Sequence, residues 1–588
     1  MRLPFFRVVV VGLVSLALAA CGGGGDGGHQ TPVTAASISI VSGNNQTAVA
    51  GSTLPVALGV SVKDSSGRAV PAASVSWTVV AGGGSVTPAT STTDSAGLAT
   101  TNWALGGAPG ANRVTATVAG LTPVTFDAMA LAVATASVTV TSPVAKVYEG
   151  DTVQLVATAR DAAGNVLPGK PATWSSGNPA SFPVSASGEL QTWGYGPVTV
   201  TASIDGIAGS LALTIVPIEV QVTFGAKETV FDWTTDRCYD LDMVDGPAIA
   251  VRDEGVNLVM FAGNAPRYYV SRGANFNSIR RDCTQPALVS ANLPTADTYQ
   301  NQEFLWAVYR EGSTWHALVE NEFHDPIAAT CLPGSPFADN PCWYNSITYA
   351  VSTDGARSFS KPGAPAHTVA PAPYAWVPPQ PGVPAVGLAE GYFGPSNIVH
   401  SRDGYYYSFF MAIPTKNAPQ GRCVIRTSAL GDPTSWRAWD GSGFNLRMTS
   451  PYVTGQAAPV CASLATKQSQ GQLTYSSYLE RYVYLAANIT SYEGRIACGF
   501  FYELSADLIH WSQQRRLTEA RLPWCSPDPS QPTIEPVAVQ YPSLIDHADT
   551  TVNFENMGRT PHLYYLRWND GGLDRDLVRV QVTFTRTN

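Results

Sequence analysis

The N-terminal part of the chain alternates apolar and polar residues in two segments related to each other. The segments are "AGSTLPVALGVSVKDSSGRAVPAASVSWTV" (50–79) and "EGDTVQLVATARDAAGNVLPGKPATWSS" (149–176). Asp64 and Asp161 stand 97 residues apart (161 − 64), and a Gly and a Trp of each segment repeat with the same spacing. Alternation with turn signals about every eight to twelve residues is typical of β-sandwiches. We therefore predict two tandem immunoglobulin-like sandwiches, over residues 34–131 and 132–217.

From about residue 219 the pattern changes to recurring pairs of strands. Each pair has an apolar strand, a polar turn and a second, more aromatic strand, without any long 3.6-residue periodicity. The pairs span residues 245–264, 303–323, 394–413, 471–488 and 541–569, and a further strand unit follows several of them. Five such pairs predict a five-bladed β-propeller over residues 218–588, so that the whole chain is all-β.

Two similar strands stand at the two ends of this propeller segment. They are "EVQVTF" (219–224) and "RVQVTF" (579–584). Pairing them in one blade would close the ring and remove its exposed strand edges. We predict that they pair.

Residues 1–20 have the features of a cleaved signal peptide. Arg2 and Arg7 precede or flank an apolar run, "VVVVGLVSLALAA", that is too short to span a membrane. The string "LALAAC" resembles a bacterial lipobox, which implies that Cys21 is lipidated. The alternative is a plain signal peptide with a nearby structural cysteine.

The residues after the signal predict a tether. Residues 21–33 are Gly-rich and are expected to form a flexible linker. Several acyl chains on Cys21 would anchor the chain stably in a membrane. Gly22 stands where an Asp would favour retention, so we expect an outer-membrane lipoprotein, periplasmic or cell-surface facing.

Composition narrows the class of partner and the compartment. The net charge is −9 without a basic patch, which argues against nucleic acid. Beyond Cys21 the chain has an even number of cysteines, which predicts up to four disulfides in an oxidising compartment, with sequence neighbours as the natural pairs. They are Cys238, Cys283, Cys331, Cys342, Cys423, Cys461, Cys498 and Cys525. Without a CxxC pair or a Cys/His cluster we expect neither a metal nor a cofactor.

The first two domains resemble the bacterial Ig-like domains of intimin- and invasin-type surface proteins. The strings "VKDSSGRAVPAASVSWTV" and "TDSAGLATTNW" carry the resemblance in the first domain, and the match is looser in the second. The resemblance implies spacer or adhesive modules. Both domains contain few His and charged residues, so we expect them to form a stalk that has no catalytic activity.

Chemistry is expected at one mouth of the propeller channel. The start of each inner strand and the end of its return strand lie at the same mouth, so their polar residues should converge there. Catalytic candidates are Asp245, Glu322 and Glu390. Substrate-binding candidates are Glu320, His324, Asn264, Arg267, Tyr392, Ser396 and Tyr541.

Carboxylates that converge on an aromatic pocket suit the cleavage of glycosidic bonds. One acid protonates the leaving oxygen, and a second carboxylate activates water or attacks the sugar. We predict Asp245 as the base and Glu322 as the acid, acting on an oligosaccharide or polysaccharide. Glu320, His324 and Glu390 would tune or orient them.

The propeller segment resembles the five-bladed propeller glycosidases of the arabinanase, xylosidase and fructosidase group. The strings "DGPAIAVRDEGVNLVMFAGN", "GPSNIVHSRDGYYYSFF" and "SADLIHW" carry the resemblance. It implies that Asp245 stands where that group places its general base. The group also has an Asp at the third inner strand and a Glu at the fourth. Here Glu390 comes several residues early, and "QLTYSSYLERY" has no carboxylate before Glu480.

Other interpretations stay open at this point. Asp245 before Gly-Pro is also an ordinary turn former, and Glu320 and Glu322 are also consistent with surface ion pairs. The alternative function is a non-catalytic adhesin or glycan-binding lipoprotein whose head is the propeller. No GxSxG, HExxH, phosphate loop or dinucleotide motif is present in the sequence, which removes the other common enzyme classes.

Overall fold

The computed structural model is almost entirely β-structure. It describes residues 33–254, 257–324, 343–363, 366–377, 390–413, 421–464, 470–570 and 572–588. The helices are single turns: α1 (Trp233–Asp236), α2 (Pro451–Thr454), and the 3-10 turns η1 (Ala296–Thr298) and η3 (Pro433–Ser435). Within the described residues, no helix has the length and apolar character needed to cross a membrane.

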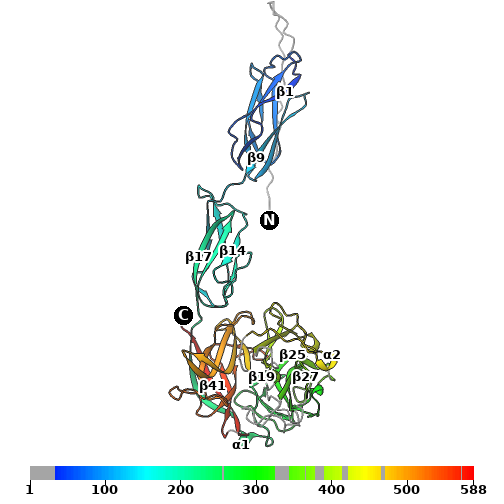
Figure 1. Cartoon of the computed structure of the whole chain (residues 1–588), viewed down its shortest axis with the longest axis vertical. Helices are drawn as coiled ribbons and strands as arrows, with labels where there is room; N and C mark the ends of the chain where they lie inside the picture. The colour runs from blue at the N-terminus through cyan, green and yellow to red at the C-terminus, as the bar shows by residue number, and fades with distance from the viewer. Residues whose placement is uncertain are drawn as a thin grey trace, which may run out of the picture. The chain divides into compact units, whose positions relative to one another are not determined.

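The first sandwich packs a four-stranded sheet, β1-β3-β7-β5, on a five-stranded sheet, β2-β9-β8-β4-β6 (Figure 1). Trp77, Trp103 and Phe126 are buried between the sheets, because alternate residues of β4, β7 and β9 point inward. The strands are β1 (Ser37–Ser42), β2 (Gln46–Val49), β3 (Leu58–Lys63), β4 (Ser74–Ala81), β5 (Gly84–Thr87), β6 (Thr90–Thr92), β7 (Leu98–Leu105), β8 (Gly110–Thr117) and β9 (Val124–Leu131).

The second sandwich is built on the four-stranded sheet β11-β17-β16-β14, with the pairs β10-β13 and β12-β15 completing it. Alternate residues of β16, among them Val200, Ala202 and Ile204, are buried. The strands are β10 (Ser137–Thr141), β11 (Val147–Tyr148), β12 (Thr152–Gln154), β13 (Val156–Arg160), β14 (Thr173–Ser176), β15 (Glu189–Gln191), β16 (Gly196–Ile204) and β17 (Ile207–Val216).

By their internal contacts the residues form two compact units. One comprises residues up to 137 together with 159–170, and the other comprises residues 138–158 together with 171–588. The second unit therefore contains the propeller and most of the second sandwich.

The remaining strands form the blades of a propeller, of which β19, β25, β27 and β41 are labelled in Figure 1. Blade 1 is the sheet β19-β20-β22-β23, and blade 2 is β25-β26-β27 with β28 at its side. Their strands are β19 (Ile249–Arg252), β20 (Leu258–Phe261), β22 (Val270–Gly273), β23 (Arg280–Arg281), β25 (Glu303–Glu311), β26 (Thr314–His324), β27 (Trp343–Ser352) and β28 (Thr368–Ala370). A separate short pair joins β21 (Arg267–Tyr268), which lies between β20 and β22 in the chain, to β24 (Leu288–Val289), which follows β23.

Blade 3 is β29-β31-β32-β33 with β30, and a parallel pairing of β29 with β27 joins it to blade 2. Blade 4 is β34-β35-β36-β37 with β39, and blade 5 is β38-β40-β41-β18. The strands are β29 (Glu390–Phe393), β30 (Val399–His400), β31 (Tyr406–Ile413), β32 (Gly421–Thr427), β33 (Arg437–Ala438), β34 (Gly471–Ser476), β35 (Arg481–Tyr492), β36 (Arg495–Ser505), β37 (Arg515–Glu519), β38 (Val539–Ile545), β39 (Asn556–Met557), β40 (His562–Trp568), β41 (Arg575–Arg586) and β18 (Val220–Phe231).

Five hydrophobic cores alternate with the five blades. Separate clusters of buried side chains fill the spaces between blades 1 and 2, 2 and 3, 3 and 4, 4 and 5, and 5 and 1. Each blade therefore buries both of its faces against its neighbours. This cyclic packing confirms the predicted five-bladed propeller, and with it the all-β fold class.

The ring is closed within blade 5. β18 pairs antiparallel with β41, and the register runs from Val220 opposite Arg586 to Phe231 opposite Leu577. The predicted pairing of the two similar strands is confirmed.

Three of the predicted disulfides are present, each between cysteines adjacent in the sequence order. They are Cys238–Cys283, Cys423–Cys461 and Cys498–Cys525. The candidate pair Cys331 and Cys342 lies outside the described residues, as does the lipidation candidate Cys21.

Candidate active site at one mouth of the propeller

Two carboxylates of blade 2 lie on one face of β26 near the end of the strand. Glu320 and Glu322 are two positions apart, and every second side chain of a strand points to the same face. Asn345 of β27 lies opposite Glu322 in the register. Its Nδ2 donates to Oε1 of Glu320 at 2.9 Å and to Oε1 of Glu322 at 3.4 Å. One amide therefore contacts both carboxyl groups.

These two carboxyl groups favour their protonated forms. Burial, and next the negative charge of Asp245, raise the pKa of Glu322 to about 8. Burial, and next the charge of Glu322, raise the pKa of Glu320 well above its ordinary value. Glu320 is fully buried, whereas the Glu322 side chain is 15% exposed. At neutral pH Glu322 is therefore a protonated acid with part of its surface open.

Asp245 lies within electrostatic reach of the two glutamates. It precedes the inner strand of blade 1, and its backbone N–H donates to the carbonyl of Gly263 at 3.3 Å. Its Oδ1 lies 2.8 Å from Nη1 of Arg575, at the start of β41. The mouth thus places an ion-paired carboxylate near a protonated one.

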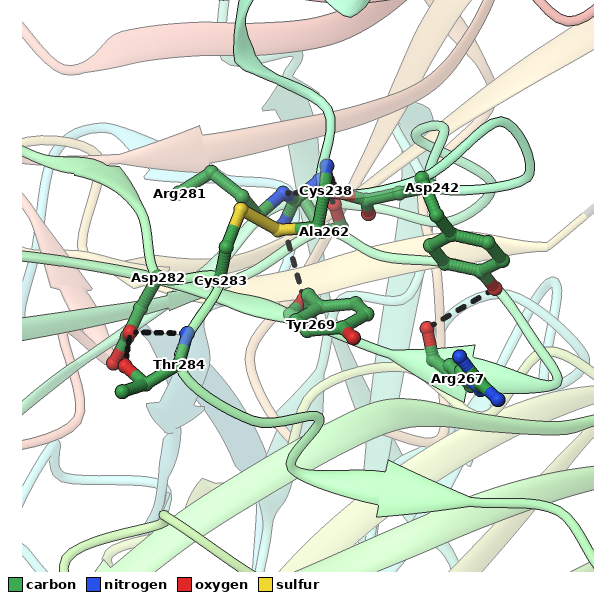
Figure 2. Close-up of a disulfide and its surroundings, with 10 residues drawn as sticks. Cys238, Asp242, Ala262, Arg267, Tyr269, Arg281, Asp282, Cys283 and Thr284 are labelled. Atoms are coloured by element: carbon green, nitrogen blue, oxygen red, sulfur yellow. Dashed lines mark hydrogen bonds and ion pairs between the residues drawn. A yellow bond between two sulfur atoms is a disulfide. The ribbon is translucent and has the colours of Figure 1, made fainter.

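The segment that carries Asp245 is fixed by a disulfide and a buried ion pair, both shown in Figure 2. Asp242 accepts the backbone N–H of Cys238 at 2.9 Å and lies 3.3 Å from Nε of Arg281. Arg281 in turn donates to the carbonyls of Tyr269 and Ala262, each at 3.0 Å. Both charged side chains are almost fully buried. Asp245 lies three residues after Asp242, so the disulfide and the ion pair hold its backbone in place.

Two substrate-binding candidates of blade 1 have other partners. Asn264 is buried and donates from Nδ2 to the carbonyl of Leu241 at 2.9 Å, so it supports the same segment from the other side. Arg267 is exposed, and its guanidinium lies 5.9 Å from the ring centroid of Tyr239. The Tyr239 hydroxyl donates to the carbonyl of Arg267 at 3.4 Å. Asn264 acts here as a support.

Tyr541 forms an aromatic wall of the mouth together with Trp306 of β25. Its backbone has a φ of 51° where the register of β38 shifts, which marks a bulge that redirects the side chain. The rings of Tyr541 and Trp306 meet edge to face with centroids 5.3 Å apart. Burial, and next the charge of Asp245, raise the pKa of the Tyr541 hydroxyl. Tyr541 is therefore neutral and close to the carboxylates.

His324 contacts the candidate acid directly. Its Nε2 lies 3.2 Å from Oε2 of Glu322, two positions along β26. Burial lowers the pKa of His324 to about 4, so the imidazole is neutral at neutral pH. It orients the carboxyl group without adding a charge to the site.

Glu390 lies beside this site on a different face of the sheet. In the parallel pairing of β29 with β27, Glu390 is opposite Tyr344, and Gly391 is opposite Asn345. Adjacent positions of a strand face opposite sides. The structure therefore brings Asp245, Glu320 and Glu322 together and sets Glu390 apart, on the side of Tyr344.

The other two candidates of blade 3 belong to its interior. Tyr392 is 1% exposed and packs edge to face on Phe410, with ring centroids 4.9 Å apart. Ser396 is fully buried, and its Oγ accepts the backbone N–H of Phe409 at 3.0 Å. Both positions stabilise the blade and present no surface to a ligand.

Amides occupy the inner strands of blades 3 and 4, where the resemblance led us to look for carboxylates. Gln472 at the start of β34 accepts the backbone N–H of Asn397 at 3.1 Å through Oε1. Both residues line a small cavity on the propeller axis. In the described part of the chain, no group of three or more His, Cys, Asp or Glu is arranged to hold a metal ion.

Sequence reasoning missed Arg575, Asn345 and Trp306. Arg575 and Asn345 lie at the starts of the third strands of their blades, whereas the paired-strand pattern in the sequence marks only the first two strands. The pairing of Arg575 with Trp568 at the end of β40 places it at the same mouth. The signal for Arg575 in the sequence is its position directly after the outer turn of its blade.

Comparison with known proteins gives similarities of fold at low identity. Neither a protein-family model nor a curated protein sequence matches the chain. An endo-arabinase from Bacteroides thetaiotaomicron matches at 11% identity over 60% of this chain and 97% of that one, with a TM-score of 0.33. A glycosyl hydrolase from Bacteroides ovatus matches at 11% identity over 61% and 94%, with a TM-score of 0.34. The D0-D1 domain of intimin matches at 15% identity over 31% and 98%, with a TM-score of 0.15.

Proposed function

We propose that the propeller hydrolyses glycosidic bonds at this mouth, with Glu322 as the acid and Asp245 as the base. One observation carries the proposal: a reachable carboxyl group whose pKa is raised to about 8 lies in the field of a carboxylate ion-paired to Arg575. Glycosidases use two carboxyl groups, one as the acid and one as the base. The environment of each group favours the protonation state that its role requires.

The roles follow from the contacts. Glu322 donates its proton to the glycosidic oxygen as the bond from that oxygen to the anomeric carbon breaks. Asp245 accepts a proton from the water that adds to the anomeric carbon, so that one water is consumed for each bond cleaved. Arg575 is ion-paired with Asp245, and His324 and Asn345 orient Glu322.

Other groups shape the site around the reacting bond. Fully buried Glu320 shares Asn345 with Glu322 and stays protonated beside it. Half-buried Tyr541, held edge to face by the buried ring of Trp306, gives an aromatic surface suited to the face of a sugar ring. We assign the substrate to oligosaccharides or polysaccharides on this basis.

We further propose that the protein is held at the cell surface through a lipid on Cys21, with the Ig-like domains as a stalk. The signal-like residues 1–20, the string "LALAAC" and the Gly-rich stretch 21–33 support this placement. Labelling of the expressed chain with a palmitate analogue, compared between the parent and Cys21→Ser, tests it.

Hydrolysis is tested with purified protein and a panel of neutral polysaccharides, by measuring released reducing ends. We expect cleavage by the parent and a loss of about 10²–10⁴-fold in Asp245→Asn and in Glu322→Gln. Glu254→Gln, at a side chain that is 78% exposed, is the matched control and should keep full activity. If the parent cleaves no member of the panel, the proposal is overturned.

A second function is favoured by the amides of blades 3 and 4. Asn397 already bonds the backbone of Leu473 through its side-chain amide, whereas Nε2 of Gln472 has no hydrogen-bond partner among the described residues. This Nε2 can donate to a sugar hydroxyl without cleaving the sugar, which suits a glycan-binding adhesin. Saturable glycan binding that persists in the double variant Asp245→Asn/Glu322→Gln, from a parent that cleaves nothing, would establish this function instead.

A further inference from the structure

A second cleft lies between the second sandwich and blade 4, away from the acidic mouth. Its volume is ≈ 140 Å³, and none of the mouth candidates lines it. Arg481 at the start of β35 and Ser505 at the end of β36 form one wall, and Asp151 and Trp193 belong to the other. Both walls are parts of the same compact unit.

The charged side chains of the cleft already have partners: Arg481 forms an ion pair, and Asp507 forms a hydrogen bond with an imidazole. Nη2 of Arg481 lies 2.6 Å from Oδ1 of Asp151, across the cleft walls. Nδ1 of His510 lies 2.7 Å from Oδ2 of Asp507. An ion entering the cleft would find each charge already paired and would lose its hydration. A neutral ligand with several hydroxyl groups suits such a surface better.

A buried hydrogen-bond acceptor belongs to the same cleft. Glu149 is 3% exposed and lines it. Its Oε1 accepts the backbone N–H of Ile218 at 2.6 Å and is ion-paired with Arg515. Its Oε2 has no hydrogen-bond partner among the described residues. Buried polar atoms are normally paired, so this oxygen is available to a ligand hydroxyl or a bridging water.

Aromatic rings give the cleft an apolar wall. Trp193 and His510 stack with ring centroids 3.5 Å apart and planes 4° from parallel. The stack joins the sandwich to blade 4 and holds both rings in place. Sugar rings have apolar faces as well as hydroxyl groups, so paired carboxylates beside flat rings are suited to them.

We propose that this cleft binds one neutral sugar unit. Sites for drug-sized ligands occupy about 300–1,000 Å³, so the cleft suits a single ring. The inference shares only its ligand class with the proposed hydrolysis and does not depend on catalysis at the mouth. The cleft would keep the propeller on a glycan while the mouth is empty.

The experiment uses the full chain carrying Glu322→Gln, so that the proposed hydrolysis at the mouth plays no part in the measurement. Glucose, galactose, mannose, xylose and arabinose are titrated by calorimetry, with saturation-transfer NMR to identify binders. Ala506→Trp fills the cleft at an exposed lining residue. Ala429→Trp, exposed in the corresponding turn of blade 3, is the matched control. Gln191→Ala removes a polar lining group without adding bulk.

We expect at least one sugar to bind, and Ala506→Trp and Gln191→Ala to weaken it by about tenfold or more while Ala429→Trp leaves it unchanged. Absence of binding by all five sugars, or equal binding by Ala506→Trp and Ala429→Trp, would overturn the inference. If binding is sensitive to Ala506→Trp and the parent protein, without Glu322→Gln, cleaves no glycan, the cleft is upheld and the hydrolysis is rejected.

Discussion

At the scale of single residues, the site depends on how one strand presents Glu320 and Glu322. The two side chains share a face and an amide partner, so their protonation states are coupled. Burial favours the neutral form of both, and the charge of Asp245 adds to this for Glu322. The more exposed member of the pair is the one that can give its proton to a substrate.

This protonation state predicts the alkaline limb of the pH–rate profile. The pKa of Glu322 is raised, so its protonated form is present below about pH 8 and is lost as the pH rises through that value. We expect kcat/KM to fall about tenfold per pH unit above it. Steady-state rates on a soluble glycan between pH 5 and about pH 10 measure the limb. Residual activity of Glu322→Gln should lack it, and an unchanged limb in that variant would contradict the assignment.

The sequence located part of this site because strand alternation and hairpin return are local rules. They placed Glu320 and Glu322 on one face and Asp245 and Tyr541 at the starts of inner strands. They could not exclude Tyr392, because its burial depends on packing against Phe410 of another strand.

At the scale of elements, similar turns end the third strands of blades 2 and 4. Ser352 donates to Asp354 at 2.7 Å, and Ser505 donates to Asp507 at 3.2 Å. Each Asp then accepts backbone N–H groups of the following residues. The repeated Ser and Asp were visible in the sequence because such turns are local. The parallel pairing of β27 with β29 was not predictable, since it joins strands of different blades.

The anchor of the Asp245 segment predicts unequal effects of disulfide removal. Opening the Cys238–Cys283 bridge in Cys238→Ala/Cys283→Ala should cost about 2–4 kcal/mol of stability. It should also lower kcat/KM, because the bridge fixes the residues before Asp245. Calorimetry and steady-state kinetics on the same preparations measure the two effects.

The matched control is Cys498→Ala/Cys525→Ala, which opens the bridge of blade 4. It should lose a similar stability and retain kcat/KM below its melting temperature. Equal losses of kcat/KM in both double variants would contradict a specific role for the first bridge.

At the scale of the whole molecule, the second sandwich is joined to the propeller by buried polar contacts. Arg481 donates from Nη2 to the carbonyl of Glu149 at 2.8 Å and is ion-paired with Asp151. Glu149 reaches Arg515 and the backbone of Ile218. The sequence predicted separate domains and could not predict this joint, because its partners are more than 300 residues apart in the chain.

The joint predicts that this sandwich unfolds together with the propeller. Arg481→Ala should remove about 1–3 kcal/mol, since it leaves the buried Glu149 carbonyl without its donor. Differential scanning calorimetry should show the propeller transition moving to lower temperature. Arg113→Ala, whose partner Asp127 is 49% exposed, should have little effect. An unchanged propeller transition in Arg481→Ala would show that the joint is weak.

Ring closure by β18 and β41 also determines when the propeller can finish folding. β18 ends at Phe231 and β41 begins at Arg575, so β18 has no partner strand until nearly the whole propeller segment is available to fold. Until then β18 is an unpaired strand, and its free backbone N–H and C=O groups can pair with a strand of another chain. Lys227 and Glu228, both on β18, place charge on this edge and discourage such pairing. The last blade is therefore completed only when residues 575–586 are available to pair, whichever blade forms first.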